Sequence, residues 1–344
     1  MIDQIKQASE DFGENSSVLI TGGTGSFGQE FVAHVLRQSR PRRLIIFSRD
    51  ELKQWEMAQR FRPEEYPCLR FFIGDVRDER RLETAMRGVD VVVHAAAMKH
   101  VPAAEYNPFE CIHTNVLGAE NIVNAAIRNN VRKVLALSTD KAASPINLYG
   151  ASKLASDKIF VAANNLSGKS GTRFAIVRYG NVLGSRGSVL PLFRKLIADG
   201  ATSLPITDAR MTRFWITLKS GVGFVLSSLA MMRGGEIFIP KIPSMKVVDL
   251  ARVLAPDLPH HIVGIRPGEK LHEVMITEGD ARSTVELSDR YVIQPDFHWW
   301  NVLRYDEKDG AKQVAENFCY SSDQNAQWMS DSEMQNLLRD GGYL

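Results

Sequence analysis

The stretch Val18-Leu19-Ile20-Thr21-Gly22-Gly23-Thr24-Gly25-Ser26-Phe27-Gly28 decides the fold class of this chain. It starts as a short apolar, β-branched run and continues into glycines at G-x-x-G-x-x-G spacing. Such glycines permit a tight turn and a close approach of the backbone to a pyrophosphate, and the following helix presents unpaired N–H groups to the anion. A turn placed between a first strand and a helix therefore predicts a dinucleotide-binding βαβ unit. The alternative is a glycine turn that binds no ligand.

Strand-like and helix-like segments alternate from this turn to about residue 180. The expected strands are 18–21, 43–47, 69–73, 89–94, 133–138 and 173–178, and the expected helices are 29–38, 119–128 and 149–163. Alternation of this kind predicts βαβ units and a parallel sheet. The near-continuous apolar run 89–93 is typical of a strand covered on both faces. We therefore expect an α/β fold, a Rossmann-like doubly wound parallel sheet with a smaller C-terminal substrate-binding domain.

The regular alternation ends near residue 181, where prolines and glycines recur. Residues 1–16 are polar and are expected to form a loose arm. The predicted division is a Rossmann domain over 1–180 with a return segment near 207–240, a substrate-binding region over 181–206 and 241–320, and a C-terminal tail over 321–344.

Composition limits the class of protein. The chain has 344 residues, of which 44% are hydrophobic and 24% charged, with a net charge of +2. These values are ordinary for a globular protein and give no support to a nucleic-acid or membrane-surface role. The three cysteines form no CxxC pair, and no apolar run reaches the roughly 18 residues of a membrane span. We expect a cytoplasmic protein without a metal site, a nucleic-acid partner or a membrane contact.

The end of the second expected strand indicates which dinucleotide binds. An acidic residue there favours NAD because it binds the ribose 2′-OH, whereas a guanidinium suits a 2′-phosphate. Here Arg49 ends the strand and Lys53 follows one helical turn later. Ser48-x-x-Glu51 matches a capping box that would point a helix N-terminus at the same place. We predict NADP, although Asp50 could favour NAD and the two basic residues could be solvated.

Two further strand ends complete the expected cofactor site. Asp75 after the third strand is expected to meet the adenine amine, unless it or Asp78 caps the next helix. Small residues after the fourth strand allow close passage of the cofactor, and a lysine follows them into the crevice. The predicted cofactor-binding residues are Gly22, Thr24, Gly25, Ser26, Phe27, Gly28, Ser48, Arg49, Lys53, Asp75, Val76, Ala95, Ala96, Ala97, Lys99, Tyr149 and Lys153.

The candidate catalytic residues follow the fifth expected strand. Thr139, Asp140 and Lys141 lie where open α/β sheets bind ligands. Tyr149 and Lys153 are four residues apart and share one helical face. A nearby ammonium favours the phenolate and lowers a tyrosine pKa, and a phenolate can take the proton of a substrate hydroxyl as hydride leaves for a nicotinamide.

These features resemble the extended short-chain dehydrogenase/reductase superfamily, and within it the inverting UDP-N-acetylglucosamine 4,6-dehydratases. The similarity runs from about residue 16 to 296. It is carried by Ser138-Thr-Asp-Lys-Ala142, Pro145-Ile-Asn-Leu-Tyr-Gly150, Val177-Arg-Tyr-Gly-Asn-Val-Leu-Gly-Ser-Arg-Gly-Ser-Val189, Met211-Thr-Arg-Phe214 and Arg266-Pro-Gly-Glu-Lys-Leu-His-Glu273.

The resemblance implies an activity and a division of roles. The substrate would be UDP-N-acetylglucosamine, and the product the first intermediate of pseudaminic acid, a sugar of bacterial flagellin and surface glycans. Asp140 would help the C6 hydroxyl leave, and Lys141 would take the C5 proton where retaining enzymes carry Glu. A lysine can do so only if burial or positive charge, here from Lys153 and an oxidised nicotinamide, depresses its pKa. The implied substrate ligands are Lys99, Thr139, Asn181, Ser188, Val189, Arg213, Arg266 and Glu269, and the implied assembly is a homohexamer.

Two other functions fit the same motifs. The first is a UDP-HexNAc epimerase, or a bifunctional epimerase/dehydratase, since some relatives carry Met in place of the catalytic tyrosine while this chain has Tyr149. The second is a non-catalytic NADP-binding regulator, a class that usually loses the Tyr or the Lys. Both Tyr149 and Lys153 are present here.

Overall fold

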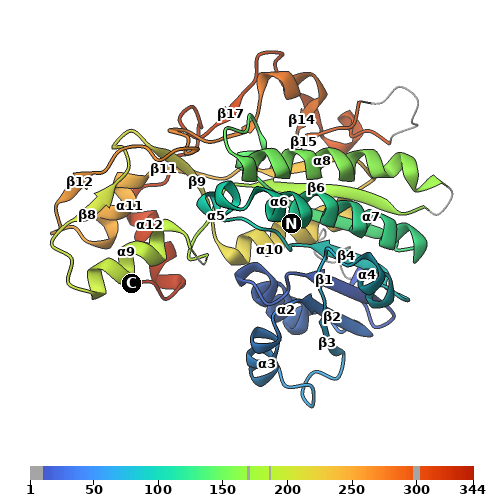
Figure 1. Ribbon diagram of the computed structural model, residues 1–344. Coiled ribbons are helices and arrows are strands. Elements are labelled where there is room, and N and C mark those ends of the chain that lie inside the picture. The colour runs from blue at the N-terminus through green and yellow to red at the C-terminus, as the bar shows by residue number, and fades with distance from the viewer. Residues whose placement is uncertain (1–10, 169–170, 186, 297–302) are drawn as a thin grey trace.

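A ten-stranded sheet forms the centre of the computed structural model, which describes residues 11–168, 171–185, 187–296 and 303–344 (Figure 1). Its strands, in spatial order, are β16 (Lys312–Gln313), β14 (Thr284–Glu286), β15 (Arg290–Ile293), β10 (Ile237–Pro240), β6 (Arg173–Tyr179), β5 (Lys133–Thr139), β4 (Val91–His94), β1 (Ser17–Thr21), β2 (Arg43–Ser48) and β3 (Leu69–Ile73).

Seven neighbouring strands of this sheet, from β3 to β10, are parallel. Every residue of β1 and β4 is buried, as expected for strands covered by helices on both faces. The predicted Rossmann-like parallel sheet is therefore confirmed. The antiparallel strands β14, β15 and β16 extend it, although they come from the range expected to form the substrate-binding region.

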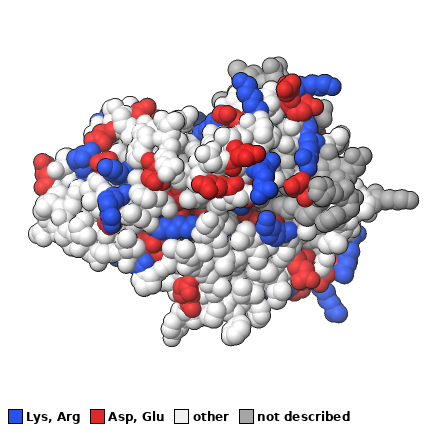
Figure 2. Space-filling model, turned by 90° about the horizontal axis from the view of Figure 1, so that it is seen from above, with Lys and Arg blue, Asp and Glu red and all other residues white. Residues whose placement is uncertain are grey.

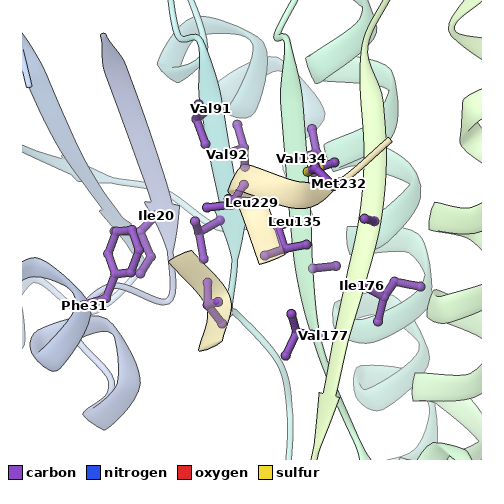
Figure 3. Close-up of a cluster of buried hydrophobic side chains, with 14 of the residues drawn as sticks. Ile20, Phe31, Val91, Val92, Val134, Leu135, Ile176, Val177, Leu229 and Met232 are labelled. Carbon is purple, nitrogen blue, oxygen red and sulfur yellow. The ribbon is translucent and has the colours of Figure 1, made fainter. Parts of the chain in front are cut away.

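Helices lie on both sides of the sheet. The large ones are α2 (Ser26–Gln38), α3 (Glu51–Arg60), α4 (Glu79–Ala85), α7 (Gly118–Arg128), α8 (Leu148–Leu166) and α10 (Leu218–Met231). Helices α2 and α10 pack against each other, and α4, α7 and α8 form a second packed group. Figure 3 shows how Phe31 of α2 and Leu229 of α10 meet Ile20 and Val92 of the sheet. This apolar layer holds the strand ends in fixed positions.

Short elements connect the large ones. Between β4 and α7 the chain forms α5 (Val101–Tyr106), α6 (Pro108–Ile112) and the π-helical turn η1 (His113–Leu117). The 3₁₀ turns are η2 (Asp140–Ala142), η4 (Glu278–Ser283) and η5 (Glu307–Asp309). Strand β13 (Val274–Ile276) pairs with β17 (Tyr320–Ser321), which brings the C-terminal part of the chain beside η2.

A smaller lobe lies at one end of the sheet, on the left of Figure 1. Its elements are β7 (Asn181–Val182), α9 (Val189–Ala198), β8 (Leu204–Ile206), β9 (Thr212–Ile216), β11 (Ser244–Lys246), α11 (Val247–Leu254), β12 (His260–Ile262) and α12 (Asp331–Asp340). Its core includes Trp215, Met245, Met334 and Leu338. The expected tail thus contributes an amphipathic helix whose apolar face completes this lobe.

The loose arm was expected over residues 1–16, of which residues 1–10 lie outside the described range. For residues 11 and 12 the expectation is wrong, because both are packed against the sheet domain. Phe12 is 2% exposed and packs on Phe31, and Asp11 forms a buried ion pair with Lys133. No helix in the described part of the chain is both long and apolar enough to cross a membrane.

Candidate active site

The glycine turn leads directly into the N-terminus of α2. Gly22 has φ +65°, and a Cβ there would lie 2.9 Å from the Ala96 Cα, so glycine is required for both reasons. Gly25 precedes the first turn of α2, and within the described chain no side chain caps that turn. The amides of Ser26, Phe27 and Gly28 therefore face outward at the positive end of a 13-residue helix. These features fit a dinucleotide pyrophosphate.

The end of β2 differs from its sequence prediction. The expected capping box from Ser48 to Glu51 is wrong, because Asp50 caps α3 by accepting the Lys53 amide at 3.0 Å. The Ser48 hydroxyl instead hydrogen-bonds Thr24 at 2.8 Å and ties β2 to the glycine turn. The Lys53 ammonium pairs with Asp50, whereas the Arg49 side chain is 69% exposed, with a guanidinium nitrogen 3.8 Å from Asp75. Arg49 is therefore the better placed of the two cations for a 2′-phosphate.

Asp75 is held by its neighbour Arg77. Arg77 donates three hydrogen bonds to the carboxylate, and Asp78, not Asp75, caps α4. Burial alone would raise the pKa of Asp75, but the hydrogen bonds and charge of Arg77 lower it overall. Asp75 thus presents a carboxylate, although one already engaged by Arg77.

A cavity of about 780 Å³ joins the glycine turn to the carboxyl end of β5. It is lined by every predicted cofactor-binding residue and by four other predicted site residues. The cofactor set is Gly22, Thr24, Gly25, Ser26, Phe27, Gly28, Ser48, Arg49, Lys53, Asp75, Val76, Ala95, Ala96, Ala97, Lys99, Tyr149 and Lys153, and the others are Thr139, Lys141, Asn181 and Ser188, with Lys99 shared. This volume matches the clefts that hold cofactors.

Tyr149 and Lys153 enter the cavity from the first turns of α8. Asn147 caps this helix by accepting the Gly150 amide at 2.7 Å, and a Cβ at Gly150 would collide with the Lys141 carbonyl oxygen. Burial raises the pKa of Tyr149 to about 12, against the opposing effects of the Lys141 charge and a hydrogen bond with Thr139. The expected lowering of this pKa is therefore wrong for the protein alone, because the desolvation of a phenolate outweighs the nearby ammonium. Burial lowers the pKa of Lys153.

Lys141 lies between two buried carboxylates. Its Nζ is 3.0 Å from Oδ1 of Asp140 and 2.9 Å from Oε1 of Glu273. Burial disfavours the ammonium, but the charges of Asp140 and Glu273 outweigh burial and raise the pKa of Lys141. The expected depression of this pKa is wrong, since the sequence did not reveal Glu273 as the second anion. Thr139 donates a hydrogen bond to Oδ1 of Asp140 at 2.9 Å, which links the pair to Tyr149.

Five predicted site residues do not line the cavity. Asp140 is fully buried, and its Oδ2 lies near Gly180, which does line the cavity. Arg213 is 5% exposed and donates to the carbonyls of Thr212, Lys270 and Leu271. The others are Val189, the first residue of α9, Glu269, which pairs with Arg213 at 3.6 Å, and the exposed Arg266.

The segment that carries Arg266 and Glu269 is nevertheless attached to the site. Asn147 donates a hydrogen bond to the Gly268 carbonyl at 2.7 Å, and Lys270 donates one to the Ala143 carbonyl at 2.6 Å. The caps of the catalytic helix and turn thus fix this segment next to the cavity.

Sequence reasoning missed several functional candidates. In the sequence, Glu273 is only the last residue of the 266–273 motif and has no role assigned to it. Its pairing with Lys141 depends on contact between β13 and η2. Tyr179, Thr114 and His100 also line the cavity. Tyr179 is the last residue of β6 and pairs with Thr139 at the carboxyl end of the sheet, a position that could have marked it.

Neither the surface charge nor the grouping of possible metal ligands indicates a second site among the described residues. On the face seen in Figure 2, acidic and basic side chains are interspersed, and no patch of one sign covers it. No group of three or more His, Cys, Asp and Glu side chains within the described residues could hold a metal ion.

Residues 18–295 match the model of a family described as polysaccharide biosynthesis protein. The chain belongs to this family. The chain is similar to two inverting UDP-N-acetylglucosamine 4,6-dehydratases of Campylobacter jejuni, of which the serotype O:2 protein is 57% identical over 94% of this chain and 97% of its own. A UDP-glucose 4-epimerase of Rickettsia canadensis is 40% identical over 94% of this chain and 95% of its own.

Solved structures show the same architecture. The protein Pen from Bacillus thuringiensis has a TM-score of 0.87 and 36% identity, covering 97% of this chain and 99% of that one. A dTDP-glucose 4,6-dehydratase from Streptomyces venezuelae, solved with NAD bound, has a TM-score of 0.66 and 27% identity, covering 74% and 86%. NAD in that dehydratase shows that this architecture can hold a nicotinamide dinucleotide.

Proposed function

We propose that this chain dehydrates UDP-N-acetylglucosamine at C4/C6 with inversion at C5, giving a UDP-4-keto-6-deoxy-L-arabino-HexNAc. It is a hydro-lyase, similar over nearly its full length to the inverting 4,6-dehydratases. One observation carries the proposal: a single cavity joins the glycine turn to Tyr149 and to Lys141 paired with Asp140. We further propose that the product is the first intermediate of pseudaminic acid.

The cofactor is proposed to be NADP. The outward amides of Ser26 and Phe27 suit its pyrophosphate, and the exposed Arg49 guanidinium suits a 2′-phosphate. A bound nicotinamide would supply the hydride acceptor for C4 and the hydride donor for C6, so the reaction would have no net redox change. The remaining chemistry falls to the side chains of this chain.

Tyr149 is proposed to take the proton of the 4-hydroxyl group. Its pKa of about 12 makes it a phenol in the protein alone, so it needs help to lose its own proton. The positive charge of Lys141 lowers this pKa and supplies part of that help, and the ammonium of Lys153, four residues along α8, is proposed to add to it. Both groups favour the phenolate and orient it toward the substrate.

Lys141 and Asp140 are proposed to carry out the elimination. Lys141 starts as an ammonium and Asp140 as a carboxylate, the wrong forms for a base at C5 and an acid at C6. A proton passed from Nζ to Oδ1 across 3.0 Å corrects both, giving an amine and a carboxylic acid. The amine then takes the C5 proton, and the acid protonates the departing C6 hydroxyl to give water. The pair ends as it began. Tyr149, which lines the same cavity and holds the proton taken from the 4-hydroxyl group, is proposed to give that proton to C5 on the opposite face, which inverts that centre.

The smaller lobe is proposed to bind the UDP-sugar. Asn181 and Ser188 line the cavity from its side, and the Oγ of Ser188 is buried with no hydrogen-bond partner among the described residues. Arg266 is exposed beside the site and suits the diphosphate through bidentate hydrogen bonds. Lys99 and Thr139 complete the contacts from the cavity wall. Val189 adjoins Ser188 at the start of α9 and is proposed to contact the substrate there, whereas Arg213 and Glu269 would act by holding the segment that carries Arg266. The proposed assembly is a homohexamer.

A mass-spectrometric assay tests the activity. Incubation with UDP-N-acetylglucosamine and NADP should give a sugar nucleotide that is lighter by one water and carries a 4-keto group. An epimerase would instead give a product of unchanged mass that separates chromatographically. An unchanged substrate in the presence of bound NADP would favour the non-catalytic regulator and overturn the proposal.

A further inference from the structure

Glu273 is a buried carboxylate that the reaction scheme above leaves without a role. It immediately precedes β13, and its side chain is 2% exposed. Oε1 lies 2.9 Å from Lys141 Nζ, while Oε2 is buried and has no hydrogen-bond partner among the described residues. Its backbone amide donates to Ser322 Oγ at 2.9 Å. A buried carboxylate is costly unless a cation compensates it, so its main compensation is the Lys141 ammonium.

The charged groups around Lys141 come from four elements. Asp140 faces it from η2 and Glu273 from the segment before β13. Arg213 on β9 approaches Glu273 with its Nε at 3.8 Å and repels the Lys141 ammonium. Lys270 acts on the same carboxylates, and Tyr149 faces Lys141 from α8. Without Glu273, Lys141 would keep one anion and would still face two cations.

Glu273 does not line the cavity, so it reaches the substrate only through Lys141. We propose that Glu273 is a positioning residue for the dehydration: its Oε1 holds Lys141 Nζ beside Oδ1 of Asp140, the atom that receives the Nζ proton. This inference rests on the proposed function. The carboxylate keeps its charge throughout, because the proton moves only from Nζ to Asp140, and Lys141 regains a proton from C5.

The test is a direct titration of Lys141 in Glu273→Gln, a variant of nearly the same shape. The side chain of Lys141 is 26% exposed and lines the cavity, so a small amine-reactive reagent such as acetic anhydride can reach it. Only the neutral amine reacts. Loss of one adjacent opposite charge shifts a pKa by about 1–3 units, so labelling of Lys141 at pH 9 should become roughly 10- to 1000-fold faster.

Turnover provides the second readout. Glu273→Gln should lower kcat by about 10²-fold, the cost of a misplaced catalytic group, with KM for UDP-N-acetylglucosamine unchanged. In a Lys141→Met background the same substitution should have no further effect, because Glu273 acts only through that lysine. Glu286→Gln is the matched control, since it breaks a 2.8 Å glutamate–lysine pair with Lys241 away from the cavity. It should change neither readout.

Each outcome bears on the proposal. Unchanged Lys141 labelling in a folded Glu273→Gln protein overturns it, as does an equal loss of kcat with and without Lys141. If the glutamine variant does not fold, Glu273→Asp carries the test, because it withdraws the charge by one methylene and should accelerate labelling to a smaller extent. If Lys141 in Glu273→Asp is labelled at the wild-type rate, the proposal is also overturned. The labelling uses no substrate, so it stands apart from a failure of the dehydratase assay.

Discussion

Replacing Lys141 with Met should separate the two halves of the reaction. The substitution keeps the length of the side chain and removes the cation between Asp140 and Glu273, which are 1% and 2% exposed. Breaking a buried ion pair by removing one partner typically costs 3–5 kcal/mol. Because the Lys141 side chain is itself 26% exposed, we expect the lower end, about 3 kcal/mol, in denaturant unfolding with NADP absent.

The pH dependence of this loss has a defined sign. The folded-state pKa of Lys141 lies above its ordinary value, since the charges of Asp140 and Glu273 outweigh the effect of burial. A raised pKa contributes stability that is complete below the ordinary lysine value, about 10.4, and is lost as pH rises through the folded-state value. The contribution of Lys141 to the difference in unfolding free energy between wild type and Lys141→Met should therefore stay constant from pH 7 to pH 9. It should shrink above pH 10.5.

Kinetics then assigns the roles. Lys141→Met should still oxidise C4, so absorbance of reduced cofactor should appear on adding UDP-N-acetylglucosamine. Deuterium uptake at C5 from heavy water and release of water should fall by roughly 10²–10⁴-fold, the usual contribution of a general base. Tyr149→Phe is the contrasting variant, because it removes the base of the first step. It should give neither reduced cofactor nor C5 exchange.

Two results would refute this reasoning. C5 exchange at the wild-type rate in Lys141→Met would mean that another residue is the base, with Tyr149 the leading candidate. Absence of reduced cofactor in Lys141→Met would mean that Lys141 positions the substrate for the first step. Circular dichroism at the assay temperature must show that the variant is folded in either case.

Three further predictions follow from single residues. Arg49→Ala should weaken the binding of NADP by about 1–3 kcal/mol more than the binding of NAD, as measured by calorimetric titration. Equal losses for the two cofactors would contradict the proposed contact between Arg49 and the 2′-phosphate. Arg266→Ala should raise KM for the UDP-sugar more than it lowers kcat, whereas an unchanged KM would limit Arg266 to a structural role. His94 is buried, which, with the nearby Lys153 charge, lowers its pKa to about 3. A depressed histidine pKa contributes stability above pH 6.5 that is lost as pH falls toward 3, so His94→Gln should flatten acid unfolding over that window, and an unchanged profile would contradict this assignment.

Local patterns were sufficient for the cofactor half of the molecule. The glycine turn, the alternating strands and the Tyr149–Lys153 spacing depend on residues a few positions apart, where backbone geometry dictates which groups meet. The parallel order of β1 to β6 follows from the short right-handed connections between them. Because the strands and their order were predictable, the strand ends that line the cavity could also be predicted from the sequence.

Tertiary structure alone decided the charges of the site. Glu273 reaches Lys141 because β13 packs beside η2, and no spacing along the sequence encodes that contact. Burial turned the expected lowering of the Tyr149 pKa into a rise, since desolvation depends on every element packed around a group. The sequence by itself thus determined the fold and the family, and it indicated the side chains that are proposed to react. The folded chain determined their protonation states, because a pKa sums long-range charges and solvent exclusion that only three-dimensional packing brings together.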